Sequence, residues 1–579
     1  MSCSDGVCEM VRARRFAINT DPNDGDDDGL VPVTSGQQQQ TVPAMSSVTE
    51  PLSEAQLNII GQSVALIHVS GFQKSFRTPW LPGERVGGTG SGWFVRPPFV
   101  SADSPVRYLM TCFHVVEGAN PDVPIKIETV ATDKKRIPAR IVAVMPQVDA
   151  ALLEIIDEDI VKQNIFRAWP VGDSKSLKAG SKLSVYGYPL GMNRIKVIDM
   201  TLNGIQFGLG QVDGAINPGH SGAPVVDQQD GKVVGFITSG IPAIDANNVS
   251  FFQPIAYMKA LWYDIVPSMR NAIIRRGRLG IEYQNTTNSF LEMVGTGPTQ
   301  RNAKTGKSDC SSGVVVQHVS SLSPLVDPPL SIKPLDVLCS FETEIDGKQY
   351  FFDVDNEGDV DVPWYKEKMH LPDVLHMVRR NTPITFHVWK TDAKKLVSHS
   401  VLLPEINVNG FNRLYPPYDA LPYVAFGGLL VQPLSANLRH AFRELYKCTD
   451  YAEIEKPALI LVDLFGNSAA EEANVLTRGS VITHVNGIPV HTLDEYKDAM
   501  PRAQQGKFLS IRTKGNSIVT VPVQRVIQEE PQIAQEYAYP VDTFLLDALK
   551  QQQQQSSSTT DTTSSSSPTT LKNQTKERR

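Results

Sequence analysis

The sequence lacks the features that mark membrane-spanning and exported chains. No run approaches the roughly 18 apolar residues that a helix needs to cross a bilayer. The beginning of the chain has no uninterrupted apolar stretch of the kind that a secretory signal requires, and its acidic run between residues 21 and 28 has the wrong sign for a transit peptide. These absences predict an intracellular protein of the cytoplasm or nucleus, without a membrane span.

Cysteine is also scarce, with six residues in 579. The cysteines show no paired spacing, and Cys3 and Cys8 have no further ligands nearby that could complete a metal site. We therefore expect no disulfide framework, no metal and no cofactor, which fits a reducing compartment.

Neither sign of charge is in large excess, since the net charge is -7 and charged residues make up 20% of the chain. This balance gives no reason to expect nucleic acid or an anionic membrane as a partner. The hydrophobic content of 41% is ordinary for a globular protein, and the length predicts roughly three or four domains.

The two ends of the chain differ from its middle. Residues 1–52 lack periodic apolar patterning, and residues 546–579 consist mainly of Gln, Ser and Thr. Such segments cannot bury enough apolar surface to fold, so both ends are predicted to be disordered tails.

Between the tails, short strand-like runs dominate. Residues 64–257 contain runs such as SVALIHV, RYLMTCFHVV and KLSVYGYP, separated by Gly, Pro, Asn and Asp, which predicts an all-β sandwich or barrel. A helical pattern follows over residues 255–274, broken by Pro267. Two similar units of about 110 residues come next, from about 278 to 404 and from about 411 to 526, and both predict small α+β domains.

One glycine-rich loop carries a candidate nucleophile. Ser221 lies between Gly219 and Gly222 in the segment NPGHSGAP, and the small residues allow a tight loop with inward-pointing amides. We expect the amides of Gly219, His220 and Ser221 to form an oxyanion hole. A serine hydroxyl is not nucleophilic at neutral pH, so a nearby base is required.

A histidine and an aspartate at the ends of apolar runs supply the other two roles. His114 lies in TCFHVV, and Asp149 opens the run DAALL. Asp149 is predicted to be partly buried there, and a histidine N–H would satisfy its carboxylate. These residues predict a triad in which His114 is general base and then acid, and Asp149 orients it.

The boxes FHVV, DAALL and INPGHSGAP, with GYPLG at 187–191 and GSGWFV at 90–95, resemble the trypsin-fold proteases of the HtrA/Deg family. His220 replaces the usual Asn of that family's serine box, and Ala223 replaces its second Gly. Only the backbone of His220 is needed for the oxyanion hole, so we expect its side chain at an exposed position of the loop.

The resemblance implies a mainly β protein with a double β-barrel protease domain at residues 53–275. It also implies an ATP-independent serine endopeptidase that acts on unfolded or misfolded polypeptides. A homo-oligomer, a trimer or a multiple of it, is expected by the same resemblance. Two other functions stay open, namely a processing protease for one defined precursor and a proteolytically silent scaffold or chaperone. The intact triad argues against the silent scaffold.

The residue six positions before the serine suggests a specificity. Trypsin-fold enzymes that cleave after Lys or Arg have Asp at that position, and this chain has Ala215. An uncharged pocket cannot offset the desolvation of a cationic side chain, so cleavage after small or medium aliphatic residues is predicted. The candidate pocket residues are Ala215, Ile216, Ile237, Thr238 and Gly240.

The two α+β units resemble PDZ domains. Leu279-Gly280-Ile281 is similar to the carboxylate-binding loop of a first PDZ-like domain at 276–404. Phe426-Gly427-Gly428-Leu429 matches that loop in a divergent second domain at 405–545, which carries insertions as in the eukaryotic and plant Deg proteins. Such loops bind peptide carboxy termini or strands. For each domain the alternatives of peptide binding, gating and a purely structural role stay open.

Overall fold

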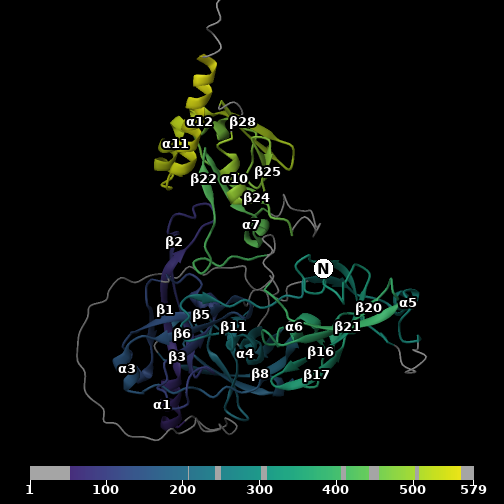
Figure 1. Ribbon diagram of the computed structural model, residues 1–579. Helices are drawn as coiled ribbons and strands as arrows, with labels where there is room; N and C mark the ends of the chain where they lie inside the picture. The colour runs from purple at the N-terminus through teal and green to yellow at the C-terminus, as the bar shows by residue number, and fades with distance from the viewer. Residues whose placement is uncertain are drawn as a thin grey trace, which may run out of the picture. The chain divides into compact units, whose positions relative to one another are not determined.

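The computed structural model describes residues 53–561 except 121, 193, 207, 215, 241–248, 301–308, 406–411, 443–454 and 503–506. The described chain forms two compact units and is mainly β, as the sequence predicts (Figure 1). Unit 1 contains the chain up to Gln73, Glu84–Ile406 and Tyr415–Asp419. Unit 2 contains Lys74–Gly83, Asn407–Leu414 and the chain from Ala420 onward.

Six strands of unit 1 close into a first barrel. Their order is β5-β4-β1-β2-β3-β6, and β6 pairs back with β5 to complete the ring. Strand β6 is buried along its whole length because its apolar run faces both the barrel interior and the layer outside it. The strands are β1 (Val64–Gln73), β2 (Glu84–Val95), β3 (Tyr108–Thr111), β4 (Ile125–Glu128), β5 (Ile137–Met145) and β6 (Ala150–Ile155).

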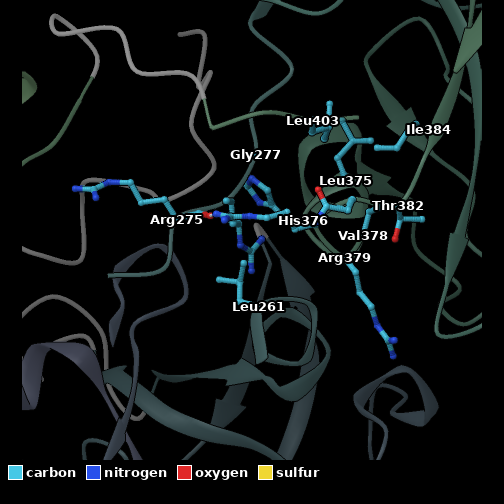
Figure 2. Close-up of a pocket in the computed structure, with 13 residues that line it drawn as sticks. Leu261, Arg275, Gly277, Leu375, His376, Val378, Arg379, Thr382, Ile384 and Leu403 are labelled. Carbon is cyan, nitrogen blue, oxygen red and sulfur yellow. The ribbon is translucent and has the colours of Figure 1, made fainter. Parts of the chain in front are cut away.

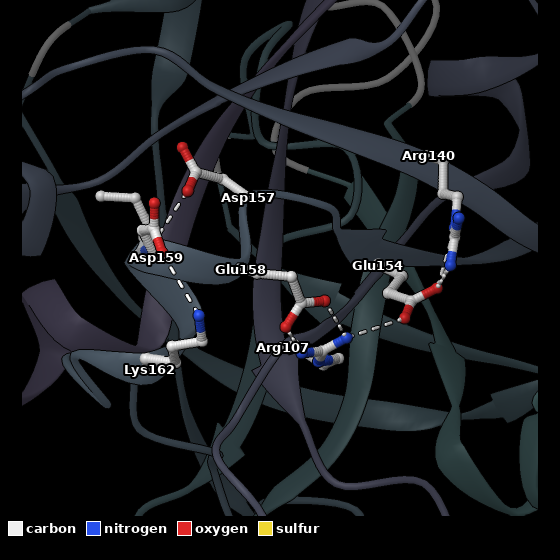
Figure 3. A network of polar contacts seen from close by, with 8 residues as sticks. Arg107, Arg140, Glu154, Asp157, Glu158, Asp159 and Lys162 are labelled. Atoms are coloured by element: carbon white, nitrogen blue, oxygen red, sulfur yellow. Dashed lines mark hydrogen bonds and ion pairs between the residues drawn. The ribbon is translucent and has the colours of Figure 1, made fainter.

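A charged network marks the place where this barrel closes (Figure 3). Glu154 on β6 is only 4% exposed, and a buried carboxylate needs partners. It accepts two hydrogen bonds from Arg140 on β5, at 2.8 and 2.9 Å, and one from Arg107, just before β3, at 3.4 Å. Arg107 also pairs with Glu158 at 2.7 Å. The network therefore ties together the three strands at the closure.

A second closed barrel follows in the order β10-β11-β12-β9-β8-β7. Its strands are β7 (Lys182–Gly187), β8 (Lys196–Gln206), β9 (Leu209–Asp213), β10 (Pro224–Asp227), β11 (Val233–Gly240) and β12 (Val249–Pro254). The two barrels confirm the predicted trypsin-like double barrel. Helix α4 (Ile255–Trp262) ends before Pro267, and β13 (Ala272–Ile273) then pairs in parallel with β5. The helical pattern predicted for 255–274 is therefore interrupted, as Pro267 indicates.

The remaining part of unit 1 contains an antiparallel sheet with the path β14-β15-β16-β20-β21, and β17 also pairs with β16. Among the described strands, β14 pairs with β15 alone and so lies at the edge. The strands and helices are β14 (Ile281–Gln284), β15 (Val314–Val319), β16 (Val337–Ile345), β17 (Lys348–Asp353), β18 (Asp359–Val360), β19 (Met369–His370), β20 (Ile384–Lys390), β21 (Lys395–Val401), α5 (Asn288–Met293) and α6 (Leu371–Leu375).

This sheet also contains a disulfide, which the spacing of the cysteines does not predict. Cys310 and Cys339 are bonded, with their Cα atoms 5.5 Å apart, and both are buried beside Trp389. The fold brings together two cysteines that are 29 residues apart and show no paired spacing in the sequence. The expectation of no disulfide framework therefore misses this bond.

Unit 2 is built on the sheet β22-β23-β24-β25-β27-β28, with β26 beside β25. Helix α12 runs past the predicted start of a tail at 546, because Leu545, Leu546 and Leu549 are buried in the core of unit 2. The rest of both predicted tails lies outside the described residues. The elements are β22 (Val424–Phe426), β23 (Leu429–Pro433), β24 (Leu459–Leu464), β25 (Val481–Val485), β26 (Ile488–Pro489), β27 (Phe508–Thr513), β28 (Ile518–Pro522), α7 (Ala436–Ala441), α9 (Ala469–Glu472), α10 (Leu493–Ala499), α11 (Val523–Glu536) and α12 (Thr543–Asp561).

Candidate active site

The candidate base, His114, follows directly on the end of β3. Thr111 is the last residue of β3, and the short helix α2 (Phe113–Val116) carries the histidine, whose side chain is 38% exposed. The amide of Phe113 donates to the carbonyl of Asp149 at 3.0 Å. The backbone around the histidine is therefore fixed to the backbone around the aspartate.

Asp149 holds His114 through both of its carboxylate oxygens. It lies just after the turn Pro146–Val148 with a left-handed φ of 49°, and its side chain is 14% exposed. Oδ1 accepts the amide N–H of His114 at 2.9 Å, and Oδ2 lies 2.8 Å from His114 Nδ1. Because a carboxylate only accepts, Nδ1 carries the hydrogen and Nε2 is left to take a proton from a substrate-directed hydroxyl.

Thr238 completes the surroundings of Asp149. Its hydroxyl donates to Asp149 Oδ2, the same oxygen that faces His114. The sequence analysis places Thr238 in the specificity pocket, whereas its hydroxyl is directed to the aspartate. Its sequence surroundings, an apolar strand in the second barrel, carry no signal of this contact.

Glycines allow the serine loop to fold against β2. Gly219 and Gly222 have φ of 97° and 84°, and a side chain on Gly222 would lie 2.2 Å from the carbonyl oxygen of Ser91. Ser91 in turn donates its amide to the carbonyl of Ser221 at 2.8 Å and its hydroxyl to the carbonyl of Gly219 at 2.7 Å. Ser91, in the middle of the GSG motif, therefore supports the loop on the side opposite to solvent.

The three predicted oxyanion donors divide into two groups. In the part of the chain that the structure describes, the amides of Gly219 and Ser221 donate to no protein acceptor. The amide of His220 donates to the carbonyl of Asn217 at 3.2 Å. Among the described residues, two amides two residues apart thus have no protein acceptor, while the third closes the turn.

The side chain of His220 is buried, with 1% exposure, so the expectation of an exposed loop position is wrong. Its Nδ1 lies 3.1 Å from the carbonyl oxygen of Asn217, while its Nε2 is buried without a partner among the described residues. Burial lowers the pKa of His220, and the Asn217 carbonyl opposes this shift. The ring is a packing element of the loop rather than an exposed base.

Cys112 lies beside the pair, and its Sγ together with ligand atoms of His114 and Asp149 falls within 4.8 Å. Burial raises the pKa of the Cys112 thiol well above its usual range. A metal ligand must be a thiolate, so this protonated thiol is a poor one. The S–H donates to the carbonyl of Ile237 at 3.0 Å. The group therefore fits a triad with a buried neighbour better than a metal site.

The remaining predicted pocket residues have different positions. Ile237 is fully buried in the core of the second barrel, and Ile216 packs against that core. Gly240 is the last residue of β11. Ala215 lies outside the described residues. Ala223 is fully buried, and Gly187 provides the space for its methyl group, since a side chain there would lie 2.9 Å from it.

The two predicted carboxylate loops differ in structure. In the first, Gly280 has φ of 68°, and its carbonyl accepts the amide of Ser320 at 2.8 Å just before the edge strand β14. The second is a two-residue turn between β22 and β23, with φ of 63° at Gly427 and 81° at Gly428. Gly427 donates its amide to a side chain of the same chain, Glu530.

Figure 2 shows a small cavity in unit 1 between the α4 region and the segment after α6. None of its described lining residues belongs to the triad. It is rich in arginine, but Arg275 pairs with Asp419 at 2.5 Å and Arg380 with Asp264 at 3.4 Å. The paired charges indicate a structural role for this cavity.

Comparisons with known proteins identify a trypsin-like peptidase domain in the chain. A family model described as a trypsin-like peptidase domain matches residues 90–236. The serine protease Do-like HtrB of Bacillus subtilis is 26% identical over 281 residues, which are 46% of this chain and 55% of the relative. A probable periplasmic serine endoprotease, DegP-like, of Halomonas elongata is 30% identical over 198 residues, 32% of this chain and 38% of the relative. The chain thus spans about half the length of the first of these curated relatives.

Among solved structures, the HtrA-type protease AlgW with decapeptide is 21% identical, with a TM-score of 0.41, and the match covers 61% of this chain and all of that one. Several relatives, from Halomonas elongata, Marinomonas sp. and Rickettsia conorii among others, are named probable periplasmic endoproteases. The expected location in the cytoplasm or nucleus is therefore contradicted. None of the helices in the described parts of the chain is both long enough and apolar enough to cross a membrane.

Proposed function

Because the chain is a member of the HtrA/Deg family of trypsin-fold serine proteases, we propose that it is an ATP-independent serine endopeptidase with Ser221 as its nucleophile. The observation that carries the proposal is the His114–Asp149 contact at 2.8 Å, with Thr238 on the same carboxylate oxygen. A purely structural barrel would not need a half-exposed histidine held by both oxygens of a partly buried aspartate.

Each residue of the triad, and each oxyanion donor, acts at a defined step of the proposed reaction. His114 Nε2 takes the proton of the Ser221 hydroxyl as the oxygen attacks the peptide carbonyl, and later gives it to the leaving amine. Asp149 keeps the ring in the required tautomer and stabilises the imidazolium that forms. The free amides of Gly219 and Ser221 donate to the oxyanion of the tetrahedral intermediate.

The proposal extends to substrates and location. We infer that unfolded or misfolded polypeptides are the substrates, and that assemblies of trimers or their multiples act on them. The edge strand β14 offers the first PDZ-like domain a place where a peptide strand can add. We place the protein in an exported compartment, where the Cys310–Cys339 disulfide would persist.

The test is a serine-directed fluorophosphonate probe applied to the wild type and to Ser221→Ala. We expect the wild type to be labelled and the variant to be unlabelled, because the probe reacts only with an activated serine. Ser174→Ala, which removes another buried serine, is the matched control and is expected to keep the labelling. Labelling that survives Ser221→Ala would contradict the assignment.

Digestion of casein by the same proteins then separates the two protease functions. A degradative enzyme is expected to cleave casein, and the cleavage is expected to vanish in Ser221→Ala. A wild type that is labelled but leaves casein intact would favour the processing protease for one precursor.

A further inference from the structure

The second PDZ-like module has no free edge beside its predicted binding strand. Strand β23 pairs with β24 on one side and with β22 on the other, where Val424 lies opposite Val431 and Phe426 opposite Leu429. A peptide that adds to a sheet needs an unpaired row of amides and carbonyls. Here the amides and carbonyls on that side of β23 already pair with the antiparallel strand β22. The first module differs, because β14 pairs only with β15 among the described strands.

The predicted carboxylate loop of this module is also occupied. Glu530, on α11, is fully buried, and its Oε2 accepts the amide N–H of Gly427 at 2.7 Å. Its Oε1 accepts the hydroxyl of Tyr539 at 3.0 Å. A side-chain carboxyl group of the chain therefore lies where the terminal carboxylate of a bound peptide would be expected.

The connection between β1 and β2, Lys74–Gly83, belongs to unit 2 and packs there as a bound peptide would. The ring of Trp80 packs among three aromatic side chains, with centroid distances of 5.5 Å to Tyr423, 6.0 Å to Phe465 and 5.5 Å to Tyr539. Its indole Nε1–H donates to the carbonyl of Tyr537 at 3.0 Å. An aromatic anchor that fills a socket and satisfies its N–H is the usual form of a binding hot spot.

Polar contacts fix the same segment along its length. Arg77 pairs with Asp463, whose side chain is 10% exposed, at 2.7 Å. The carbonyl of Phe76 accepts the side-chain amide of Gln432 at 2.9 Å. A charged pair with one buried partner and a main-chain contact add orientation to the aromatic anchor.

We propose that the second PDZ-like module binds the chain's own Lys74–Gly83 segment, with Trp80 as the anchor, in place of the carboxy terminus of an external peptide. The proposal rests on the proposed function only in assigning the module to the PDZ type. Its consequence concerns the protease barrel: β2 begins at Glu84, directly after the bound segment, and carries Ser91, which supports the serine loop. The module thereby holds the chain at one end of the strand that supports Ser221.

The test is hydrogen–deuterium exchange of the full chain in the Ser221→Ala background, comparing Trp80→Ala with the parent. We expect exchange to rise about tenfold or more in residues 74–83 and also in the Tyr537–Tyr539 segment, since three ring contacts are lost. Exchange in β24 is expected to stay unchanged. Phe72→Ala is the matched control, because Phe72 is an exposed aromatic residue on β1 of the same connection, and it is expected to alter neither segment.

Two results would overturn the proposal. The first is unchanged exchange at Tyr537–Tyr539 in Trp80→Ala, which would show that the segment is not bound there. The second is a loss of protection in β24 as well, which would make Trp80 an ordinary core residue of the module. The measurement needs no catalysis, so a failure of the protease assignment would appear in the fluorophosphonate test and not here.

Discussion

At the scale of single residues, the site depends on contacts with Asp149. Its two oxygens accept three hydrogen bonds, two from His114 and one from Thr238. A partly buried carboxylate with this many donors keeps a fixed position, and the position of the imidazole follows from it. In the proposed reaction, Thr238 would therefore act through Asp149 as a positioning residue.

Substitution of Thr238 tests this role. Thr238→Val removes the hydroxyl but keeps the shape, and we expect kcat/KM to fall about 10- to 100-fold, since a hydrogen bond to a charged group contributes about 1.5–3 kcal/mol. Thr238→Ser retains the hydroxyl and is expected to stay within a few-fold of the wild type. Steady-state kinetics on a peptide substrate measure both. A loss in Thr238→Ser together with full activity in Thr238→Val would show that the methyl group, and not the hydroxyl, matters.

Substrate specificity is also expected to depend on a few single residues. The described pocket candidates, Ile216, Ile237, Thr238 and Gly240, include no carboxylate. Beside Ile216, which packs against the apolar core of the second barrel, a cationic P1 side chain would lose its hydration without gaining a carboxylate partner. We expect peptides with P1 Val to be cleaved with a higher kcat/KM than matched peptides with P1 Arg. Faster cleavage of the P1 Arg peptides would refute the aliphatic pocket.

At the scale of elements, α11 places an ionisable group in the core of unit 2. Burial raises the pKa of Glu530 to about 7, while the Gly427 amide and the Tyr539 hydroxyl act in the opposite direction. Asp542 raises it further, and Glu530 in turn helps to raise the pKa values of Tyr496 and Tyr539. The same element thus covers the turn at Gly427 with a buried carboxyl group whose pKa is raised.

The sign of this dependence follows from the shift. A carboxyl group with a raised pKa in the folded state stabilises folding below its unfolded pKa, near 4.5, and this contribution is lost as pH rises through about 7. Glu530→Gln cannot ionise, so we expect the variant to lose less unfolding free energy than the wild type between pH 5 and pH 8. The difference is expected to be roughly 2–3 kcal/mol. Urea unfolding at the two pH values measures it.

The control for this experiment lies on the same helix. Glu536 is exposed near the end of α11, and Glu536→Gln is expected to leave the difference between the two pH values unchanged. A wild type and a Glu530→Gln protein with the same pH dependence would show that Glu530 does not titrate in this range.

At the scale of the whole molecule, the units do not follow the order of the chain. Lys74–Gly83 interrupts the first barrel in sequence yet belongs to unit 2. The chain therefore crosses between the two units on both sides of this segment, after Gln73 and before Glu84, in addition to the crossings between residues 406 and 420. The domain boundaries predicted at 52, 275, 404 and 545 remain predictions.

The disulfide and the names of the relatives oppose the predicted intracellular location. The sparse cysteines and the lack of an apolar stretch near the beginning of the sequence predict a reducing intracellular compartment. The Cys310–Cys339 bond and the periplasmic names of several relatives both oppose that conclusion. Spacing along the chain could not reveal the pair, because the contact forms only when the loop before β15 meets β16.

The chemistry proposed for this protein could be predicted from the sequence alone. A glycine-bounded serine, a histidine after a strand and an aspartate before an apolar run are local patterns, and short alternating runs determine the two barrels. Local patterns suffice there because backbone geometry and burial act over a few residues.

Contacts between residues that are far apart in the sequence depend on the tertiary structure. It placed Thr238 on Asp149, buried His220, joined Cys310 to Cys339 and brought Trp80 into a socket of unit 2. The sequence around each of these residues contains no pattern that would indicate its partner. Packing, which depends on the whole fold, selects them.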